Sequence, residues 1–384
     1  MLKMAVGHSD DVEPKDAIAE AIEQCRASLG EAIPQAAILF STFDAFDTWV
    51  PAAIREAFPG IAVMGTTSGA EMSSVGGYRE DSVTLATFAS DEVDITVGLG
   101  SGLTDDLDAA CRAAVEQAMA GTSKEPKVCV MVTEPYIVEP QHTLQAMRRA
   151  LPEGVVLVGG ASGRSDFSAV TPTYQFVNET VVDNGFAIML FSGPVVFSTS
   201  VGTGWKTIGP RGTVTRSENG SLNEVDGKPA VEFVKRYLDE IGPATYGNPL
   251  AVFEQGTDDF YLRAIPTVTE DGSLPVGTIP IGAEVQLTTA DTDAILSGTR
   301  DALREARERF PAGAKPEAAL LFSCAIRKFL LGTQTKVEAE LAQSAFGTAV
   351  PLVGLYCFGE VGPIEGADAS RFLNETFVTL LLGT

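Results

Sequence analysis

The sequence predicts a mixed α/β fold in which one strand–helix–strand unit occurs three times, within two domains. The first observation is a set of three short strands that are apolar throughout, as expected of strands covered on both faces: AAILFS at 36–41, KVCVMVT at 127–133 and AALLFS at 318–323. A helical stretch follows each strand, and a second strand that ends in glycine follows each helix: IAVMG at 61–65, VVLVG at 155–159 and VPLVG at 350–354. This order indicates βαβ units, which form parallel sheets with right-handed crossovers.

An amphipathic helix also precedes each of these units. AVGHSDD at 5–11 and TVGLGSGLTDD at 96–106 each lead into such a helix, and a helix at 291–310 takes the corresponding place before the third strand. Downstream, the segments 81–100 and 183–202 are predicted to form β-hairpins, because each has a turn of small or charged residues between two strand-like runs. ETFVTLLLG at 375–383 resembles the first strand of such a pair.

These patterns predict three related αβαβ-hairpin units, at about 3–100, 94–202 and 284–383. The stretch between the second and third units, roughly 203–283, has a different pattern, with a capped helix and then several strands. This change places a domain boundary near 218–224. We therefore expect an N-terminal domain at 1–220, containing two repeats, and a C-terminal domain at 221–384, containing the third.

Composition and charge exclude several classes of partner. The formal net charge of −24 argues against binding to nucleic acids and to anionic membranes. The longest apolar region, at 185–201, is broken by Ser192, Gly193 and Pro194, and it is too short for a membrane helix. No signal-peptide pattern follows Met1, so we expect a soluble, cytoplasmic protein. Its five scattered cysteines are then expected to be reduced and mostly buried.

The loops after the second strands are the predicted ligand site. In open parallel sheets, ligands collect at the carboxyl ends of strands, where small residues let them approach the main chain. Thr66, Thr67 and Ser68 in the first loop and Ser162 in the second are such residues. Alternatively, the glycines in these loops serve only to make tight turns. The loop acids Glu71, Asp166 and Glu360 are candidates to receive an ammonium group, and Glu71 and Glu360 share one offset from the preceding glycine.

The remaining candidates are aromatic, hydroxyl, thiol or cationic side chains. Arg164, Arg263 and Arg327 could each receive a carboxylate, although each charge could instead pair with a neighbour. Trp205, between Gly204 and Lys206, could form a flat wall over a ligand or pack in the core. The set is completed by three residues at the strand ends of the third unit: Ser323, Cys324 and Tyr356.

The sequence offers little for catalysis. Only two histidines are present, and CxxC pairs, GxxxxGK[ST] loops and GxSxG elbows are absent. Cys324 follows a strand near Arg327, but its possible partner His142 is far away in the sequence. We therefore predict no catalytic residue, no metal and no cofactor. An enzyme that uses Cys324, Glu71 or Glu360 is the first alternative, and an interaction scaffold is the second.

Six ordered motifs give the chain a resemblance to the FIST proteins, which have an N-terminal and a C-terminal FIST domain. They are GTTSGAEM (65–72), VGGASGRSDF (158–167), GTGWKTIGP (202–210), VDGKPAVEF (225–233), LLFSCAIRK (320–328) and PLVGLYCFGEVGP (351–363). The resemblance implies a sensory module of signal transduction that binds small ligands, with amino acids as one ligand class. Because no second composition class or linker remains once both FIST-like halves are assigned, we expect a free-standing member, which would pass its signal through a downstream protein.

Overall fold

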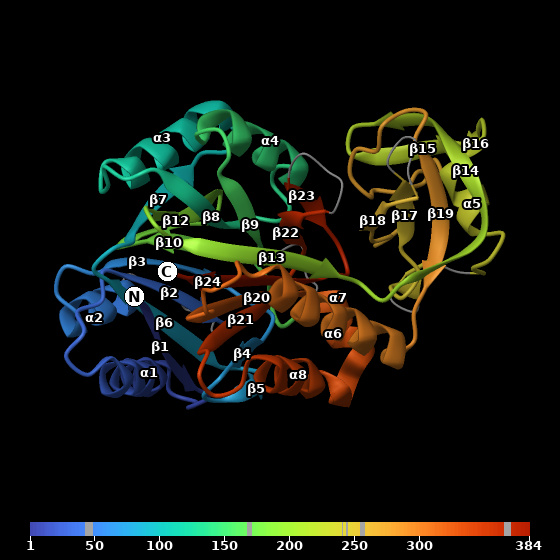
Figure 1. Ribbon diagram of the computed structural model, residues 1–384. Helices are drawn as coiled ribbons and strands as arrows, with labels where there is room; N and C mark the ends of the chain where they lie inside the picture. The colour runs from blue at the N-terminus through green and yellow to red at the C-terminus, as the bar shows by residue number, and fades with distance from the viewer. Residues whose placement is uncertain (43–48, 167–170, 240, 243–244, 254–257, 365–369) are drawn as a thin grey trace.

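Four six-stranded sheets organise the chain, and three of them share one strand order (Figure 1). The computed structural model covers residues 1–384 and describes all of them except 43–48, 167–170, 240, 243–244, 254–257 and 365–369. The first sheet runs β1 (Leu2–Ser9), β6 (Val83–Ser90), β2 (Ala36–Ser41), β3 (Ala62–Thr67), β10 (Gln175–Val177) and β11 (Thr180–Val182). The second runs β7 (Asp94–Ser101), β12 (Gly185–Ser192), β8 (Pro126–Thr133), β9 (Val156–Ala161), β22 (Glu360–Pro363) and β23 (Ser370–Leu373). The third runs β13 (Val196–Gly202), β24 (Phe377–Gly383), β20 (Ala318–Cys324), β21 (Leu352–Cys357), β4 (Glu71–Ser73) and β5 (Gly77–Arg79).

Each of these sheets contains one parallel pair, and these pairs are the strands that the sequence predicts. β2 lies parallel to β3, β8 to β9 and β20 to β21, and all the other pairings within the three sheets are antiparallel. The mixed α/β fold with three internal repeats is therefore confirmed.

The three units exchange their short hairpins in a cycle. The hairpin β4–β5 follows β3 in the chain but pairs with β21 of the third sheet. The hairpin β10–β11 of the second unit pairs with β3, and the hairpin β22–β23 of the third unit pairs with β9. Each sheet is thus completed by a neighbouring unit, which ties the three units into one body with approximate threefold symmetry.

The predicted hairpins at 81–100 and 183–202 are wrong. β6 pairs with β1 and β2, whereas β7, which follows it, pairs with β12 in another sheet. Likewise β12 belongs to the second sheet and β13 to the third. Because β6 and β12 each have a partner strand on both edges, neither has an edge left for the strand that follows it. The third unit consequently begins with β13, earlier than predicted, and an insert interrupts it.

Helices cover the outer faces of the three sheets, and the inner faces form a shared core. The helices of this body are α1 (Pro14–Leu29), α2 (Trp49–Ala57), α3 (Leu107–Met119), α4 (Pro140–Ala150), α6 (Thr292–Arg309), α7 (Ala325–Leu331) and α8 (Lys336–Phe346). Alternate residues of the central strands point inward, for example Ile38 and Phe40 in β2 and Val130 and Val132 in β8.

A glycine at one repeated position lets each long helix pack directly on its sheet. A Cβ atom added to Gly7, Gly98 or Gly202 would lie 2.0 Å from a carbonyl oxygen of α1, α3 or α6, respectively. No side chain fits in that space, so the Val-Gly pair that recurs in the sequence has a steric cause.

The insert, residues 206–289, forms the fourth sheet and a separate lobe beside the body (Figure 1). Its strands are β16 (Lys228–Pro229), β15 (Ser221–Val225), β14 (Lys206–Glu218), β19 (Glu284–Thr289), β17 (Leu250–Phe253) and β18 (Phe260–Arg263), with the short helix α5 (Ala230–Val234). The predicted domain boundary at 220/221 lies in the turn between β14 and β15, within this sheet. In the described part of the chain, no helix combines the length and apolar character needed to cross a bilayer.

Candidate functional site

The three glycine loops meet on the approximate threefold axis, as the repeat predicts, but they close on one another. The main-chain N–H of Gly69 donates to the carbonyl of Tyr356 (2.7 Å). The N–H of Gly163 donates to the carbonyl of Thr67 (3.0 Å), and that of Phe358 to the carbonyl of Ala161 (3.3 Å). In every case the donor comes four residues, and the acceptor two residues, after the last glycine of a predicted strand. We call this cycle of three hydrogen bonds the axial ring.

The glycines in these loops allow neighbouring loops to pack closely against one another. A Cβ atom on Gly163 would lie 2.5 Å from the Tyr356 carbonyl oxygen, and one on Gly69 would lie 2.8 Å from the Arg164 carbonyl oxygen. The prediction that small residues here admit a ligand to the main chain therefore has a competing explanation, because the space that they leave holds a neighbouring loop.

The hydroxyl groups of the loops bond to one another around the ring. Thr66 and Ser162 share a hydrogen bond (2.5 Å), and Ser162 also accepts one from Gln175 Nε2 (2.7 Å). Thr67 Oγ1 accepts a hydrogen bond from the Tyr174 N–H (3.2 Å), and Ser68 donates to Glu71. These side chains are buried.

The predicted acids fall into two classes. Glu71 and Glu360 are the first residues of the exchanged hairpins of the first and third units. Gln175 holds the equivalent position in the hairpin of the second unit. Asp166 instead lies exposed and pairs with Arg164 (3.3 Å), which also donates to the Pro172 carbonyl. The sequence missed Gln175 because a longer loop separates it from its strand.

Burial keeps both glutamates protonated near neutral pH. Each is fully buried, and this burial raises the pKa of Glu71 and of Glu360 to about 8. Hydrogen bonds oppose the shift: Ser68 and Ser82 donate to Glu71, and Thr376 donates to Glu360 from its N–H (3.1 Å) and hydroxyl (2.8 Å). Protonated and enclosed, these carboxyls are poor receptors for an ammonium group.

A second group of predicted residues gathers on Glu338 of α8. Arg327 pairs with this carboxylate (2.8 Å), and the hydroxyls of Ser323 (2.9 Å) and Tyr356 (2.8 Å) donate to it. Arg327 and Glu338 are fully buried, so Arg327 is already neutralised within the fold. Trp205 packs in the core nearby and donates from Nε1 to the Gly247 carbonyl (3.0 Å). Sequence reasoning missed Glu338, which lies on the buried face of an amphipathic helix.

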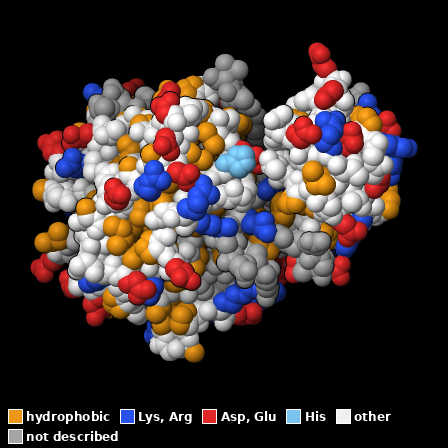
Figure 2. All heavy atoms as spheres, turned by 90° about the horizontal axis from the view of Figure 1, so that it is seen from above, with side chains coloured by type: hydrophobic (Ala, Val, Ile, Leu, Met, Phe, Trp, Pro, Cys, Tyr) orange, Lys and Arg blue, Asp and Glu red, His pale blue; other side chains and the backbone are white. Residues whose placement is uncertain are grey.

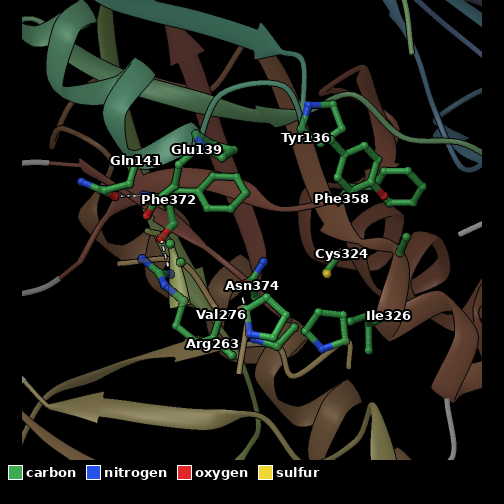
Figure 3. A pocket seen from close by; sticks show the side chains of 18 of the residues that line it. Tyr136, Glu139, Gln141, Arg263, Val276, Cys324, Ile326, Phe358, Phe372 and Asn374 are labelled. Atoms are coloured by element: carbon green, nitrogen blue, oxygen red, sulfur yellow. Dashed lines mark hydrogen bonds between the residues drawn. The ribbon is translucent and has the colours of Figure 1, made fainter. Parts of the chain in front are cut away.

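The remaining two predicted residues, Arg263 and Cys324, line a cavity of about 550 Å³ between the insert and the body (Figure 3). We call this cavity the cleft. Its walls come from the loop after β8, the start of α4, the segments around β20 and β23, and the insert. In the space-filling view a furrow separates the two lobes, and Lys and Arg side chains gather on the body near it (Figure 2).

Arg263 brings a buried positive charge to the cleft. Its side chain is 4% exposed, and Nη1 donates to the carbonyls of Phe372 (2.8 Å) and Leu262 (3.2 Å). Among the residues that the structure describes, none offers Arg263 a carboxylate within salt-bridge distance or a hydrogen-bond acceptor for Nε or Nη2. Burial lowers the pKa of Arg263 from its ordinary value, and the guanidinium nevertheless stays charged at neutral pH.

Three polar residues that the sequence did not single out complete the cleft. Glu139 accepts hydrogen bonds from the N–H (2.7 Å) and hydroxyl (2.9 Å) of Thr278 in the insert. Gln141 accepts one from the Phe372 N–H (3.1 Å), and Asn374 accepts one from the Ala264 N–H (3.3 Å). Glu139 and Gln141 flank the proline that begins α4, and this polar helix start was the available signal.

The thiol of Cys324 is almost fully buried at the cleft wall. Burial, with smaller contributions from Glu360 and Glu375, raises its pKa well above the ordinary value. The group therefore remains a thiol at neutral pH, and a thiolate is the form that a nucleophile requires.

Family models match most of the chain: the FIST N domain covers residues 35–228, and the FIST C domain covers residues 230–363. The chain belongs to the FIST family. FIST domains are associated with sensing in signal transduction.

Curated relatives of this FIST protein are uncharacterized. A protein of Mycobacterium tuberculosis H37Rv is 27% identical over 263 residues, which cover 62% of this chain and 64% of that protein. A Mycobacterium bovis protein is 24% identical over 260 residues with the same two coverages, and an Aquifex aeolicus protein is 34% identical over 83 residues, or 21% of this chain and 30% of its own. The chain thus spans just under two thirds of the length of the mycobacterial relatives.

Two solved structures align weakly with the whole chain. A cyanuric acid hydrolase from A. caulinodans gives a TM-score of 0.36 at 9% identity, over 100% of this chain and 99% of that one. PurL of T. maritima in complex with AMPPCP gives a TM-score of 0.23 at 14% identity, over 100% and 72%. Alignments at these scores carry no argument about function.

Proposed function

We propose that this FIST protein is a non-catalytic sensor that binds an amino acid or a related small carboxylate in the cleft. The observation that carries the proposal is Arg263, a buried guanidinium whose Nε and Nη2 have no acceptor among the described residues and which lines a cavity of about 550 Å³. These donors face the cleft, so a carboxylate that reaches them gains strong, charge-assisted hydrogen bonds. The cavity volume falls within the range of roughly 300–1,000 Å³ that holds small-molecule ligands.

Glu139 supports an amino acid within this class. Its Oε1 and the Nε of Arg263 would lie 3.1 and 3.8 Å, respectively, from a Cβ atom on Gly277, so the two opposite charges flank the same glycine. An ammonium and a carboxylate on one carbon could therefore reach both groups. Burial lowers the pKa of Arg263, and the negative charge of Glu139 acts against this shift.

The position of the cleft provides a route for the signal. Hydrogen bonds from Thr278 to Glu139, from Arg263 to Phe372 and from Ala264 to Asn374 cross from the insert to the body beside the ligand site. A ligand that contacts both lobes would fix their relative position, and we propose that a downstream signalling protein reads this position.

Catalysis by Cys324 has weaker support than binding, because the thiol is buried and its pKa is raised. A catalytic role for Glu71 or Glu360 would require a substrate to enter the protein interior, where both are fully buried.

The test is isothermal titration of the whole chain with a panel of amino acids, together with Arg263→Gln and the control Arg236→Gln. Arg236 is an exposed arginine of the same insert and does not line the cleft. We expect at least one carboxylate ligand to bind wild type and Arg236→Gln alike, and to raise the melting temperature of both. Arg263→Gln should weaken binding by about 10- to 100-fold, as expected for loss of a charged hydrogen-bond partner. A ligand that binds Arg263→Gln as tightly as wild type would contradict the proposal.

A further inference from the structure

Two opposite charges line the cleft at a short distance from one another without forming an ion pair. Glu139 precedes α4 in the body, and Arg263 ends β18 in the insert (Figure 3). Glu139 Oε1 lies 3.1 Å, and Arg263 Nε 3.8 Å, from the Cβ position of Gly277, so these atoms cannot be farther apart than the two distances together. The structure describes both residues and joins them by no salt bridge, so they are also more than about 4 Å apart.

This spacing suits two charges that are carried on one carbon atom. In an α-amino acid the ammonium nitrogen and the carboxyl carbon are about 2.5 Å apart. A charge-assisted hydrogen bond of about 2.8 Å at each end lets this pair reach both side chains along a bent path. In a γ-amino acid the charges are roughly 5 Å apart when the chain is extended, so the two ends reach beyond the gap.

Thr278 of the insert fixes the carboxylate of Glu139. Its N–H donates to Oε1 (2.7 Å) and its hydroxyl donates to Oε2 (2.9 Å). A carboxylate oxygen can accept more than one hydrogen bond, so Oε1 retains the capacity to accept one from an ammonium group. His142 Nε2 lies 3.7 Å from Oε2, on a residue that does not line the cleft. The Glu139 side chain is 18% exposed, so it is held in a definite orientation and is still accessible.

We propose that the cleft recognises the α-zwitterion of an amino acid, with the carboxylate on Arg263 and the ammonium on Glu139. Thr278 is then a positioning residue for Glu139. This inference rests on the proposed function and narrows its ligand class from small carboxylates to α-amino acids. Recognition of the zwitterion needs no contact with the side chain of the ligand. A hydroxy acid leaves Glu139 without a cation, and this loss should weaken binding by about 10- to 100-fold.

The experiment compares three four-carbon acids by calorimetry on the whole chain: L-2-aminobutyrate, (S)-2-hydroxybutyrate and 4-aminobutyrate. Wild type should bind L-2-aminobutyrate about 10- to 100-fold more tightly than either of the other two. Glu139→Gln should bring the affinities of the amino and hydroxy acids close to one another. The control is Glu153→Gln, which changes an exposed glutamate that does not line the cleft, and it should retain the wild-type ratio.

A second pair of variants tests the positioning role. Thr278→Val removes the hydroxyl donor at an exposed site and should lower the preference for the amino acid by about three- to tenfold. Thr278→Ser keeps the hydroxyl and should restore the preference. A purely structural role would weaken the amino and hydroxy acids equally, so an unchanged ratio in Thr278→Val would overturn the assignment of Thr278.

The possible failures differ from one another. If the hydroxy acid binds wild type as tightly as L-2-aminobutyrate and both lose affinity in Arg263→Gln, recognition of the ammonium is overturned and the proposed carboxylate site stands. If 4-aminobutyrate binds as tightly as its α isomer, the spacing does not select the ligand and the inference fails. If only amino acids with larger side chains bind, the zwitterion is not sufficient and the inference is again overturned. If no amino acid binds, the proposed function fails and this inference fails with it.

Discussion

Arg327 and Arg263 are both buried, but they lie in different surroundings. Arg327 directs its guanidinium at the carboxylate of Glu338, the hydroxyl of Thr299 and the carbonyls of Thr203 and Ile295. Arg263 bonds only to main-chain carbonyls among the described residues and faces the cleft. Burial of a charge therefore does not by itself mark a binding site. The distinguishing feature is a buried charge with donors left for a group outside the fold.

The largest expected effect tests the structural role of Arg327. Arg327→Met should lower the free energy of unfolding by about 3–5 kcal/mol, because it leaves the Glu338 carboxylate buried without its cation. Urea denaturation measures this change. Adding Glu338→Leu should recover part of the loss, and Arg304→Met, which changes an exposed arginine of α6, should cost less than about 0.5 kcal/mol. A small loss in Arg327→Met would remove the contrast with Arg263.

Arg263→Gln should affect ligand affinity more than the stability of the unliganded protein. Its effect on the free energy of unfolding without ligand should be about 1 kcal/mol, because only hydrogen bonds to two carbonyls are changed. Its effect on ligand affinity should be the 10- to 100-fold loss given above. Denaturation with and without ligand separates the two quantities, and an unliganded loss as large as that of Arg327→Met would assign Arg263 to the structural class.

The axial ring should respond to a single methyl group. Gly163→Ala should destabilise the protein by about 1–3 kcal/mol, because the added Cβ meets the Tyr356 carbonyl at 2.5 Å and the loops must separate. Gly247→Ala is a matched control, since its Cβ would make only ordinary contacts with Leu330 at 3.6 Å. Thermal unfolding compares the two variants. Equal stability would mean that the loops are free to move apart, as a ligand site there would require.

The smallest expected effect concerns the two protonated glutamates. Because burial raises the pKa of Glu71 and Glu360 from near 4.5 to about 8, the folded protein holds protons that the unfolded chain has released. The free energy of unfolding should therefore fall as pH rises toward 8. His8 acts in the opposite direction by a smaller amount. Burial lowers its folded pKa to about 4, so only the unfolded histidine, with its ordinary pKa of 6.5, still releases protons above pH 6.5, and stability rises by about 0.4 kcal/mol for this reason.

Denaturation at pH 6.5 and 8.0 measures this slope. Glu71→Gln with Glu360→Gln should lower it by on the order of 1 kcal/mol for each carboxyl. The part that remains includes Glu375, another fully buried carboxyl whose pKa is raised by burial. The third equivalent position already holds Gln175, so the amide is compatible with the ring. Glu232→Gln, at an exposed site, should leave the slope unchanged. A stability that rises over this interval in wild type would contradict the assignment.

Part of the proposed site could be predicted from the sequence. Arg263 and Cys324 were among the predicted residues and both line the cleft, whereas Glu139, Gln141 and Asn374 were not predicted. Most of the other predicted residues gather around the axial ring or on Glu338, but there other groups of the protein satisfy their hydrogen bonds. A sequence gives the donors and acceptors of each side chain, and it does not tell whether a neighbouring loop or a ligand will bond to them.

The sequence by itself determined the repeated unit, its parallel strand pairs and the glycines that bring each helix onto its sheet. These features follow from periodicity and steric size, which act over a few residues and leave a pattern in the chain. Only the tertiary structure decided that β4–β5 joins the third sheet, that the glycine loops close into the axial ring, and that Arg263 of the insert faces Glu139 of the body. Those outcomes depend on which distant surfaces pack together, because every strand edge and buried polar group needs a partner and several segments of this repeated chain could supply one.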